Sequence, residues 1–189
     1  MPFAKEKADF LSKKDKSRKG SIDLKIKKLV EKINYSNNYF TTSSCAGRIL
    51  ILTQPKSNKK SEVQYLFCSH LKITYNQLKK ILYLKKLPKD DIWFRVESAI
   101  LHVACKDAEG ALKLLKAARE VGFRRSGIIS LGKNRATIEL VSTEKIDAII
   151  AKNKKLLVNG DYLKILIKEG NKKLERAWEK IEKLRYKLK

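Results

Sequence analysis

The sequence predicts an α+β fold in which helices pack on a single, largely antiparallel mixed sheet. Segments rich in β-branched and aromatic residues follow one another at hairpin spacing, whereas a parallel sheet needs a helix between successive strands. Other segments carry apolar residues at spacings of three and four, which is typical of helices that bury one face. The strict βαβ alternation of a Rossmann fold is absent from this pattern. Hairpins, a helix and a strand occur twice in succession, which favours an internal duplication over about residues 38–105 and 122–189.

Four helices are expected from apolar periodicity and from residues that favour helix ends. Ser21 is a suitable N-cap for the first helix, and Asp107 and Gly122 are suitable residues before and after the third. Either Asn159 or Asp161 caps the last helix. The four helices cover residues 21–34, 74–86, 107–122, and from 159 or 161 to near the C-terminus. The apolar stripe of the last helix consists of Leu163, Leu166, Ile167, Leu174, Ala177, Ile181, Leu184 and Leu188.

Strand candidates occupy the segments between these helices. Residues 48–53 and 63–70 are expected to pair as antiparallel strands, because a turn region rich in Pro, Lys, Asn and Ser joins them. The longest candidate covers residues 92–105. Its alternation places four side chains on one face: Phe94, Val96, Ile100 and His102. The remaining candidates are a hairpin of residues 125–131 and 136–142, and short strands at 146–150 and 156–158.

Length and charge indicate one domain and a nucleic-acid partner. A chain of 189 residues is typical of a single domain, here residues 21–189, which follow a flexible basic arm over residues 1–20. The chain carries 44 Lys and Arg against 20 Asp and Glu, a formal net charge of +24. Such an excess favours binding to RNA or DNA, whose phosphates attract cations. The alternative is a lysine-rich solvated surface, as some proteins of thermophiles have.

No segment of the sequence suggests a membrane protein or a metal site. No apolar run approaches the roughly 20 residues that span a bilayer, and the first 19 residues lack the apolar centre of a signal peptide. Cys45, Cys68 and Cys105 are far apart and form no CxxC pair. This spacing is typical of reduced thiols and does not match known zinc patterns. A cytoplasmic protein without a bound metal is therefore expected.

A polar segment over residues 39–49 is the main candidate for a binding site. Its residues 41–44 are four consecutive hydroxyl-bearing side chains, which suit a hydrogen-bonding loop for phosphate, carboxylate or base edges. Gly47 allows a ligand to approach the backbone closely, and the guanidinium of Arg48 can bind an anion through two hydrogen bonds. The alternative is a capped turn that only leads into the next strand.

Further candidates lie outside this segment. Residues 124–127, Arg-Arg-Ser-Gly, can bind an oxyanion or phosphate, or can simply form a basic turn. His102 lies among apolar neighbours and is either a hydrogen-bonded core residue or a functional one, whereas His70 ends a strand, where functional groups are frequent. Cys45 has no nearby base in the sequence, so a structural role is expected for it. The chain contains no glycine-rich cofactor loop, P-loop or HExxH motif.

Several blocks match a known family in order along nearly the whole chain. They are residues 15–23, 33–34, 39–48, 65–70, 100–105, 122–128, 139–143, 158, 161–162 and 171–174. The most specific are Thr-Thr-Ser-Ser-Cys at 41–45 and Gly-Phe-Arg-Arg-Ser-Gly at 122–127. With these blocks the sequence resembles the wybutosine-synthesis methyltransferase family. It departs from the family at Ala46, where Ser is usual, and at Leu71, where Asp is common.

The resemblance implies an activity, a methyl donor and a partner. Members of this family N-methylate the tricyclic guanine-derived base beside the anticodon of phenylalanine tRNA. We therefore expect a methyltransferase that uses S-adenosyl-L-methionine and acts on the 4-demethylated wyosine-type base, with the anticodon stem-loop of that tRNA as its partner. Residues 21–189 would be the methyltransferase domain. The alternatives are a non-catalytic basic RNA- or DNA-binding protein, and an assembly protein that pairs through its C-terminal helix.

The resemblance and the residue types together suggest roles for individual side chains. The expected catalytic residues, chosen as proton acceptors, are Asp23 and His102. The expected donor-binding residues are Ser43, Ser44, Arg48, Ser126 and Gly127. The expected substrate-binding residues are Lys19, Thr42, Gly47, His70 and Arg125. Asp23 has the alternative role of fixing the polar segment by hydrogen bonding. The lysine runs at 72–89 and 152–155 suit the phosphates of the anticodon stem.

Overall fold

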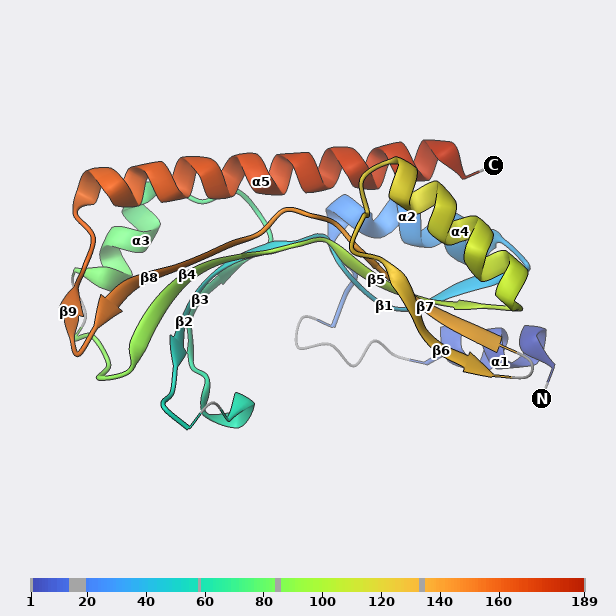
Figure 1. Ribbon diagram of the computed structural model, residues 1–189, viewed down its shortest axis with the longest axis horizontal. Helices are drawn as coiled ribbons and strands as arrows, with labels where there is room; N and C mark the ends of the chain where they lie inside the picture. The colour runs from blue at the N-terminus through green and yellow to red at the C-terminus, as the bar shows by residue number, and fades with distance from the viewer. Residues whose placement is uncertain (1, 14–19, 58, 84–85, 133–134, 189) are drawn as a thin grey trace. The chain divides into compact units, whose positions relative to one another are not determined.

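The strands form two antiparallel sheets (Figure 1). The computed structural model describes residues 2–13, 20–57, 59–83, 86–132 and 135–188. The first sheet has the order β1 (Tyr39–Cys45), β5 (Ile100–Cys105), β7 (Arg135–Val141) and β6 (Gly127–Gly132). The second has the order β3 (Tyr65–Ser69), β2 (Arg48–Gln54), β4 (Asp91–Glu97), β8 (Ile146–Lys152) and β9 (Lys155–Leu156). The α+β class and the antiparallel pairing are thus confirmed, and the fold is not of the Rossmann type.

The expectation of a single sheet is wrong, because the predicted long strand over residues 92–105 is interrupted. Ser98 and Ala99 separate β4 from β5, and these two strands belong to different sheets. The continuous alternation predicted that Phe94 and His102 share one face. They do not, because they belong to different sheets. A second interruption separates β1 from β2 at Gly47, whose φ of +92° lies in the region that favours glycine.

The chain divides into two compact units, each built from segments that are distant in the sequence. Unit 1 comprises Met1–Ala46, Ser98–Thr143 and Ala177–Lys189, and it contains the first sheet. Unit 2 comprises Gly47–Glu97 and Glu144–Arg176, and it contains the second sheet. Each sheet takes strands from both ranges of the suggested duplication, so that duplication stays a prediction.

In unit 1, helices α2 (Leu24–Tyr35) and α4 (Ala108–Glu120) cover one face of the sheet (Figure 1). The buried core between them combines apolar side chains of α2 and α4 with Leu101, Val103 and Ile138 of the sheet. The signals at the ends of α4 act as predicted, since Oδ1 of Asp107 accepts a hydrogen bond of 2.7 Å from the N–H of Gly110. Gly122 follows the helix with a φ of +107°.

Part of the segment expected to be a flexible arm is helix α1 (Phe3–Leu11). The ring centroids of Phe3 and Phe10 each lie 5.4 Å from the ring centroid of Phe40 on β1. Nζ of Lys7 donates a hydrogen bond of 2.6 Å to a backbone oxygen, and Glu6 pairs with Arg135. These contacts hold residues 3–11 against the rest of unit 1. Residues 14–19 of the expected arm lie outside the described residues.

In unit 2, helix α3 (Tyr75–Leu82) and the Gly160–Arg176 part of α5 cover one face of the second sheet (Figure 1). The side-chain amide of Asn171 on α5 makes two hydrogen bonds of 2.9 Å with the backbone of Ile73. A Cβ on Gly170 would lie 3.0 Å from Phe94, so α5 approaches the sheet closely at this glycine. A short 3₁₀ helix, Lys60–Glu62, lies between β2 and β3. Leu84, predicted to face inward from the helix 74–86, lies outside the described residues.

Helix α5 (Gly160–Lys187) follows the predicted pattern closely. Oδ1 of Asn159 accepts a hydrogen bond of 2.9 Å from the N–H of Tyr162, so Asn159 is the cap and Asp161 is not. The predicted stripe is buried from Leu163 to Leu184. Among the described residues, no helix combines the length and the apolar character that crossing a membrane requires.

Candidate functional site

Three polar side chains form a row across neighbouring strands of the sheet in unit 1. Oγ of Ser43 on β1 lies 3.2 Å from Nδ1 of His102 on β5. Nε2 of the same imidazole lies 2.9 Å from Oε1 of Glu139 on β7. The ladder places the three residues in register, since Ser43 pairs with His102 and His102 pairs with Glu139. We call these three residues the Ser-His-Glu row.

The row lies on the face of the sheet opposite α2 and α4. Its neighbours along β5, Leu101 and Val103, point into the core with those helices, so alternation turns His102 to the other face. The side chains of His102 and Glu139 are about one third exposed, at 33% and 34%, and Ser43 is exposed. Helix α1 packs against Phe40 on the same face, next to the row. The imidazole is therefore fixed on both sides and remains accessible to a ligand.

The hydrogen bonds assign one tautomer to His102. An ionised carboxylate can only accept, so Nε2 of the imidazole carries the proton that is donated to Glu139. In the neutral ring, Nδ1 then holds the lone pair and accepts from the Ser43 hydroxyl. A histidine oriented in this way can take up a proton at Nδ1 while Glu139 stabilises the resulting imidazolium.

The polar segment that positions Ser43 is a strand with a bulge, where the sequence suggested a loop. The register of β1 against β5 shifts between Thr41 and Ser43, which leaves Thr42 as the extra residue. Oδ1 of Asn34 on α2 accepts from both the backbone N–H and the hydroxyl of Thr41, at 2.7 and 3.0 Å. The Thr42 hydroxyl donates to the backbone oxygen of His102 at 3.3 Å. The bulge thereby brings Ser43, and not Thr42, opposite the imidazole.

Two of the predicted ligand-binding hydroxyls in unit 1 lie away from the row. Ser44 pairs with Leu101, so it faces the helix-covered side of the sheet. Ser126 is buried, and its hydroxyl donates to the oxygen of Phe123 at 2.6 Å and accepts from the N–H of Val141 at 2.9 Å. These bonds hold the turn before β6 and occupy the Ser126 hydroxyl.

Asp23 makes a hydrogen bond of the kind that its alternative, structural role in the sequence requires. It is the N-cap residue of α2, in place of Ser21, and it is only 7% exposed. Its Oδ2 accepts a hydrogen bond of 3.0 Å from the N–H of Ala46, just beyond the end of β1. A carboxylate oxygen of Asp23 also lies within 4.8 Å of Sγ of Cys45. Asp23 thus ties the start of α2 to the end of the polar strand.

Burial shapes the chemistry of the cysteines. The three thiols, all in the described part of the chain, form no disulfide. Burial raises the pKa of the Cys105 thiol to about 12, and the nearby Asp107 carboxylate contributes to the same upward shift. Cys105 is therefore a protonated core residue at neutral pH and not a nucleophile.

The remaining predicted residues divide between the two units. Arg125 is exposed and Gly127 begins β6, both in unit 1. Arg48, Gly47 and His70 belong to unit 2. Lys19 lies outside the described residues.

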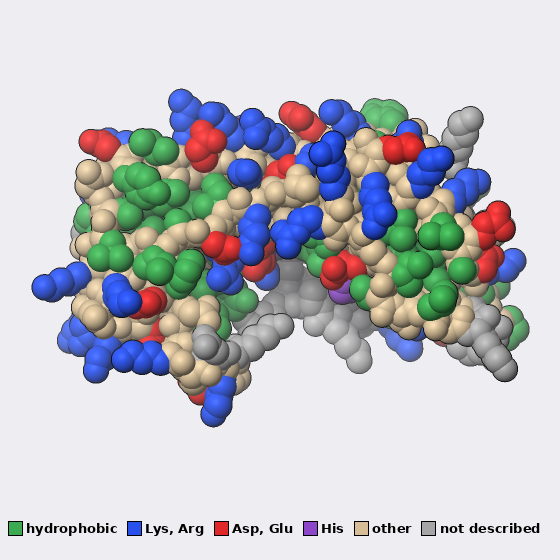
Figure 2. Space-filling view, viewed as in Figure 1, with side chains coloured by type: hydrophobic (Ala, Val, Ile, Leu, Met, Phe, Trp, Pro, Cys, Tyr) green, Lys and Arg blue, Asp and Glu red, His purple; other side chains and the backbone are tan. Residues whose placement is uncertain are grey.

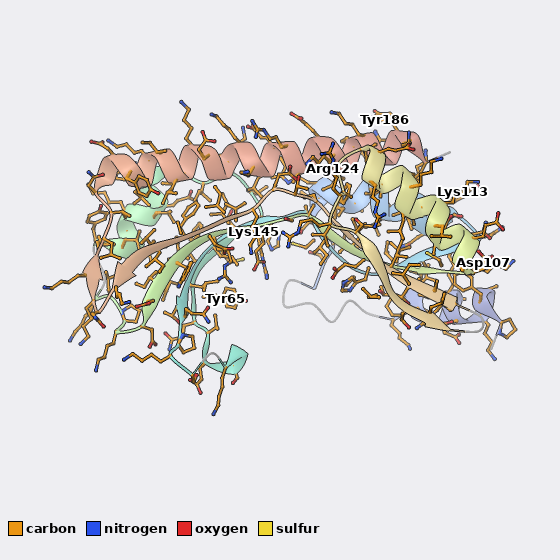
Figure 3. All side chains as sticks on the ribbon, in the orientation of Figure 1. Tyr65, Asp107, Lys113, Arg124, Lys145 and Tyr186 are labelled. Atoms are coloured by element: carbon orange, nitrogen blue, oxygen red, sulfur yellow. The ribbon has the colours of Figure 1, made fainter. Side chains whose placement is uncertain are left out.

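Arg48 makes two contacts within unit 2. Its Nε donates a hydrogen bond of 2.6 Å to Oε2 of Glu97, which is its register partner on β4. Its guanidinium carbon lies 5.8 Å from the ring centroid of Tyr65 on β3. Figure 3 labels Tyr65 on this sheet. The guanidinium is therefore held by a carboxylate next to an aromatic ring.

Sequence reasoning missed two acidic partners, Glu139 and Glu97. Glu139 lies opposite His102 on a neighbouring strand, 37 residues away along the chain. Glu97 lies opposite Arg48 on a neighbouring strand, 49 residues away. The only available signal for Glu139 was its place in a block shared with the family, residues 139–143. The partner relation itself depends on strand register, which local sequence does not specify.

Comparisons with known proteins bear on this arrangement. A family profile described as "Methyltransferase TYW3" matches residues 5–189, nearly the whole chain. The chain belongs to the TYW3 methyltransferase family. Its membership confirms the resemblance drawn from the sequence blocks. A TYW3 protein is an enzyme that transfers a methyl group, so a methyl donor is part of its reaction.

Two relatives and one solved structure show how far the likeness to TYW3 proteins extends. A Pyrococcus furiosus protein named "tRNA(Phe) 7-((3-amino-3-carboxypropyl)-4-demethylwyosine(37)-N(4))-methyltransferase 1" is 35% identical over 167 residues, 88% of this chain and 84% of that protein. A Methanocaldococcus jannaschii protein named as the same kind of N(4)-methyltransferase is 39% identical over 163 residues, covering 86% and 83%. The "Structure of PH1069 protein from Pyrococcus horikoshii" matches with a TM-score of 0.89 and 33% identity, over 100% of this chain and 96% of that one.

Proposed function

We propose that this TYW3 protein is an S-adenosyl-L-methionine-dependent N-methyltransferase that acts on a 4-demethylwyosine-type base beside the anticodon of phenylalanine tRNA. The names of the relatives from P. furiosus and M. jannaschii support the substrate. The net charge of +24 supports a polyanionic partner, and Figure 2 shows Lys and Arg side chains distributed over the visible surface of each unit. The observation that carries the proposal is the Ser-His-Glu row, because it supplies a proton acceptor.

The space beside the row suits S-adenosyl-L-methionine. Gly127 lies opposite Glu139 of the row, and a Cβ added at Gly127 would meet no other atom within 4 Å. A polar part of the donor would approach the Gly127 backbone there, while the Ser43 hydroxyl keeps its hydrogen bond to His102. When bound, S-adenosyl-L-methionine supplies an electrophilic methyl group on a sulfonium sulfur.

The protein's own part in the reaction is to remove a proton from the base. The substrate nitrogen must lose its N–H proton as its electron pair forms the new N–C bond. Ser43 accepts that proton at Oγ and passes its own hydroxyl proton to Nδ1 of His102. Glu139 then faces an imidazolium, which its carboxylate stabilises across 2.9 Å. Proton removal of this kind contributes about 10²–10⁴-fold to a rate.

We further propose that residues 21–189 work as one methyltransferase domain, since the family profile runs without a break through both units. The lysines of unit 2, at 72–89 and 152–155, would bind phosphates of the anticodon stem. Asp23 would then support catalysis indirectly, by holding the end of the polar strand.

The test is the replacement of His102 by Gln in a methylation assay. The substrate is tRNA carrying the demethylated tricyclic base, and single-turnover rates are measured at saturating S-adenosyl-L-methionine. We expect the rate to fall at least about 100-fold, because glutamine cannot take up the proton. Calorimetry should show that the variant still binds S-adenosyl-L-methionine within a few-fold of the original protein.

A matched control is Glu120→Gln, which removes another carboxylate of unit 1. Glu120 pairs with Lys187 at 2.8 Å, on the helix side of the unit. Its variant should methylate at the original rate. A His102→Gln variant as fast as this control would overturn the role of the Ser-His-Glu row. If the unsubstituted protein binds tRNA but not S-adenosyl-L-methionine, that result would favour the non-catalytic RNA-binding alternative.

A further inference from the structure

Unit 2 presents an aromatic row on the face of its sheet that α3 and α5 leave uncovered. Ile49, Phe94 and Val96 lie under Gly170 of α5, so the alternate residues of β2 and β4 face the other way. Tyr65 on β3 and Trp93 on β4 both pair with Leu52 on β2, one from each side. Figure 3 shows Tyr65 on the side of the sheet turned away from α5.

The two aromatic rings are spaced for separate ligand groups. Tyr65 and Trp93 lie in one row, two strands apart, which places their backbones about 10 Å from each other. Tyr65 is 44% exposed, Trp93 is half-buried, and Ile149, which pairs with Trp93 from the other side, is 38% exposed. Aromatic side chains on one face of a sheet are a known means of stacking RNA bases.

An arginine accompanies each ring. The guanidinium carbon of Arg48 lies 5.8 Å from the centroid of Tyr65, and that of Arg95 lies 5.9 Å from the centroid of Trp93. Guanidinium planes stack on bases in the same way as aromatic rings do. Each ring and its arginine therefore make a mixed stacking surface.

The acidic groups on this face decide which part of a nucleic acid it suits. Nε of Arg48 donates to Glu97 at 2.6 Å, and Nε of Arg95 donates to Asp147 at 2.5 Å. Nζ of Lys145 also lies 2.6 Å from Asp147. These carboxylates compensate much of the positive charge, so the face attracts phosphates weakly. It suits uncharged bases, which stack without needing a net charge.

We infer that Tyr65 and Trp93, with Arg48 and Arg95 beside them, form a base-stacking surface for unpaired nucleotides of the RNA substrate. The inference rests on the proposed function insofar as that substrate is a tRNA, whose anticodon loop supplies unpaired bases. It assigns the recognition of single-stranded RNA to the sheet of unit 2. Phosphate contacts are left to lysines elsewhere.

The experiment measures binding of a short RNA to the full chain. The probe is an eight-nucleotide single-stranded RNA with one 2-aminopurine, whose fluorescence reports stacking. Tyr65→Leu and Trp93→Leu keep an apolar side chain and remove the ring. Each should weaken binding at least about fivefold, the lower end of what one lost base stack costs. Tyr65→Phe, which keeps the ring, should restore the affinity.

Salt dependence separates stacking from charge. Because the leucine variants remove no charge, the slope of log affinity against log salt concentration should equal that of the original protein. The matched control is Tyr186→Leu in unit 1, where an exposed tyrosine also has an arginine 4.1 Å from its ring centroid. Tyr186 lies on a helix without an aromatic partner in register, so this variant should bind the probe normally.

The outcomes distinguish this inference from the proposed function. If the original protein methylates tRNA and the Tyr65 and Trp93 variants bind the probe as Tyr186→Leu does, the stacking surface is refuted and the function stands. If the variants lose binding while the original protein shows no methyl transfer, the stacking surface stands and the proposed function fails. Unchanged S-adenosyl-L-methionine binding and circular dichroism confirm that the variants are folded.

Discussion

His102 and Glu139 share a hydrogen bond of 2.9 Å between Nε2 and Oε1, although they come from different strands and lie 37 residues apart. Each side chain is about one third exposed. The carboxylate therefore determines which ring nitrogen of the histidine carries the proton, while part of the imidazole stays exposed to solvent. This relationship yields the first prediction.

Replacing Glu139 by Gln should slow methylation about 10- to 100-fold. The amide keeps a hydrogen bond to Nε2, but it bears no charge to stabilise an imidazolium and does not fix one tautomer. The loss should be in the single-turnover rate, with little change in tRNA affinity. A rate equal to that of the Glu120→Gln control would contradict a role for Glu139 in proton transfer.

Replacing Asp23 by Ala should lower the free energy of unfolding by about 1–3 kcal/mol. The change leaves the buried N–H of Ala46 without its acceptor at 3.0 Å. Asp23→Asn keeps an acceptor oxygen and should lose less. Urea denaturation followed by circular dichroism measures both. If the two variants are as stable as the original protein but inactive, Asp23 is a catalytic acceptor and not a structural one.

Cys105 and Cys68 should react differently with iodoacetamide. Burial, followed by the Asp107 charge, raises the pKa of Cys105 to about 12, whereas Cys68 is exposed. At pH 8 we expect alkylation at Cys68 and none at Cys105, as mass spectrometry of the peptides would show. The raised pKa also means that the folded state loses stability as the pH rises from about 9 towards 12. Rapid alkylation of Cys105 in the folded protein would disprove its burial.

Lysines in the last turn of α3 should contribute to the salt dependence of tRNA binding. Lys79 and Lys80 are exposed there, within the run at 72–89. Their replacement by Gln should reduce the slope of log affinity against log salt concentration by about 1–2, since each phosphate contact adds roughly 0.7–0.9. Fluorescence anisotropy at several salt concentrations gives the slope. An unchanged slope would place the phosphate contacts elsewhere.

Local signals predicted the elements that depend on local chemistry. Helix α4 begins after Asp107 and ends before Gly122 as expected, and the hairpin of β6 and β7 joins the predicted segments. The assignment of β4 and β5 to different sheets was not predictable in this way. Only a two-residue interruption at Ser98 and Ala99 separates them, and which strand each pairs with depends on distant parts of the chain.

The candidate site shows the same division. Residue type alone indicates Ser43 and His102 as candidates, because they are a hydroxyl on a polar segment and a histidine within a strand. It does not indicate Glu139, Tyr65 or Trp93, whose place in the proposals comes from register with residues on other strands. It also does not show that the Ser126 hydroxyl, which is predicted to bind a ligand, is hydrogen-bonded to the backbone.

Unit 1 is assembled from segments that are distant in the chain, and this affects when it can fold during synthesis. Its core joins Ile26 and Leu29 of α2 to Ile181 and Leu184 of α5. A nascent chain whose α5 has not yet left the ribosome therefore cannot complete this core, although the strands of unit 1 have already emerged. Contacts over such sequence separations also slow folding after release, because long loops must close first. Until then the partly formed sheet remains exposed to chaperones and proteases.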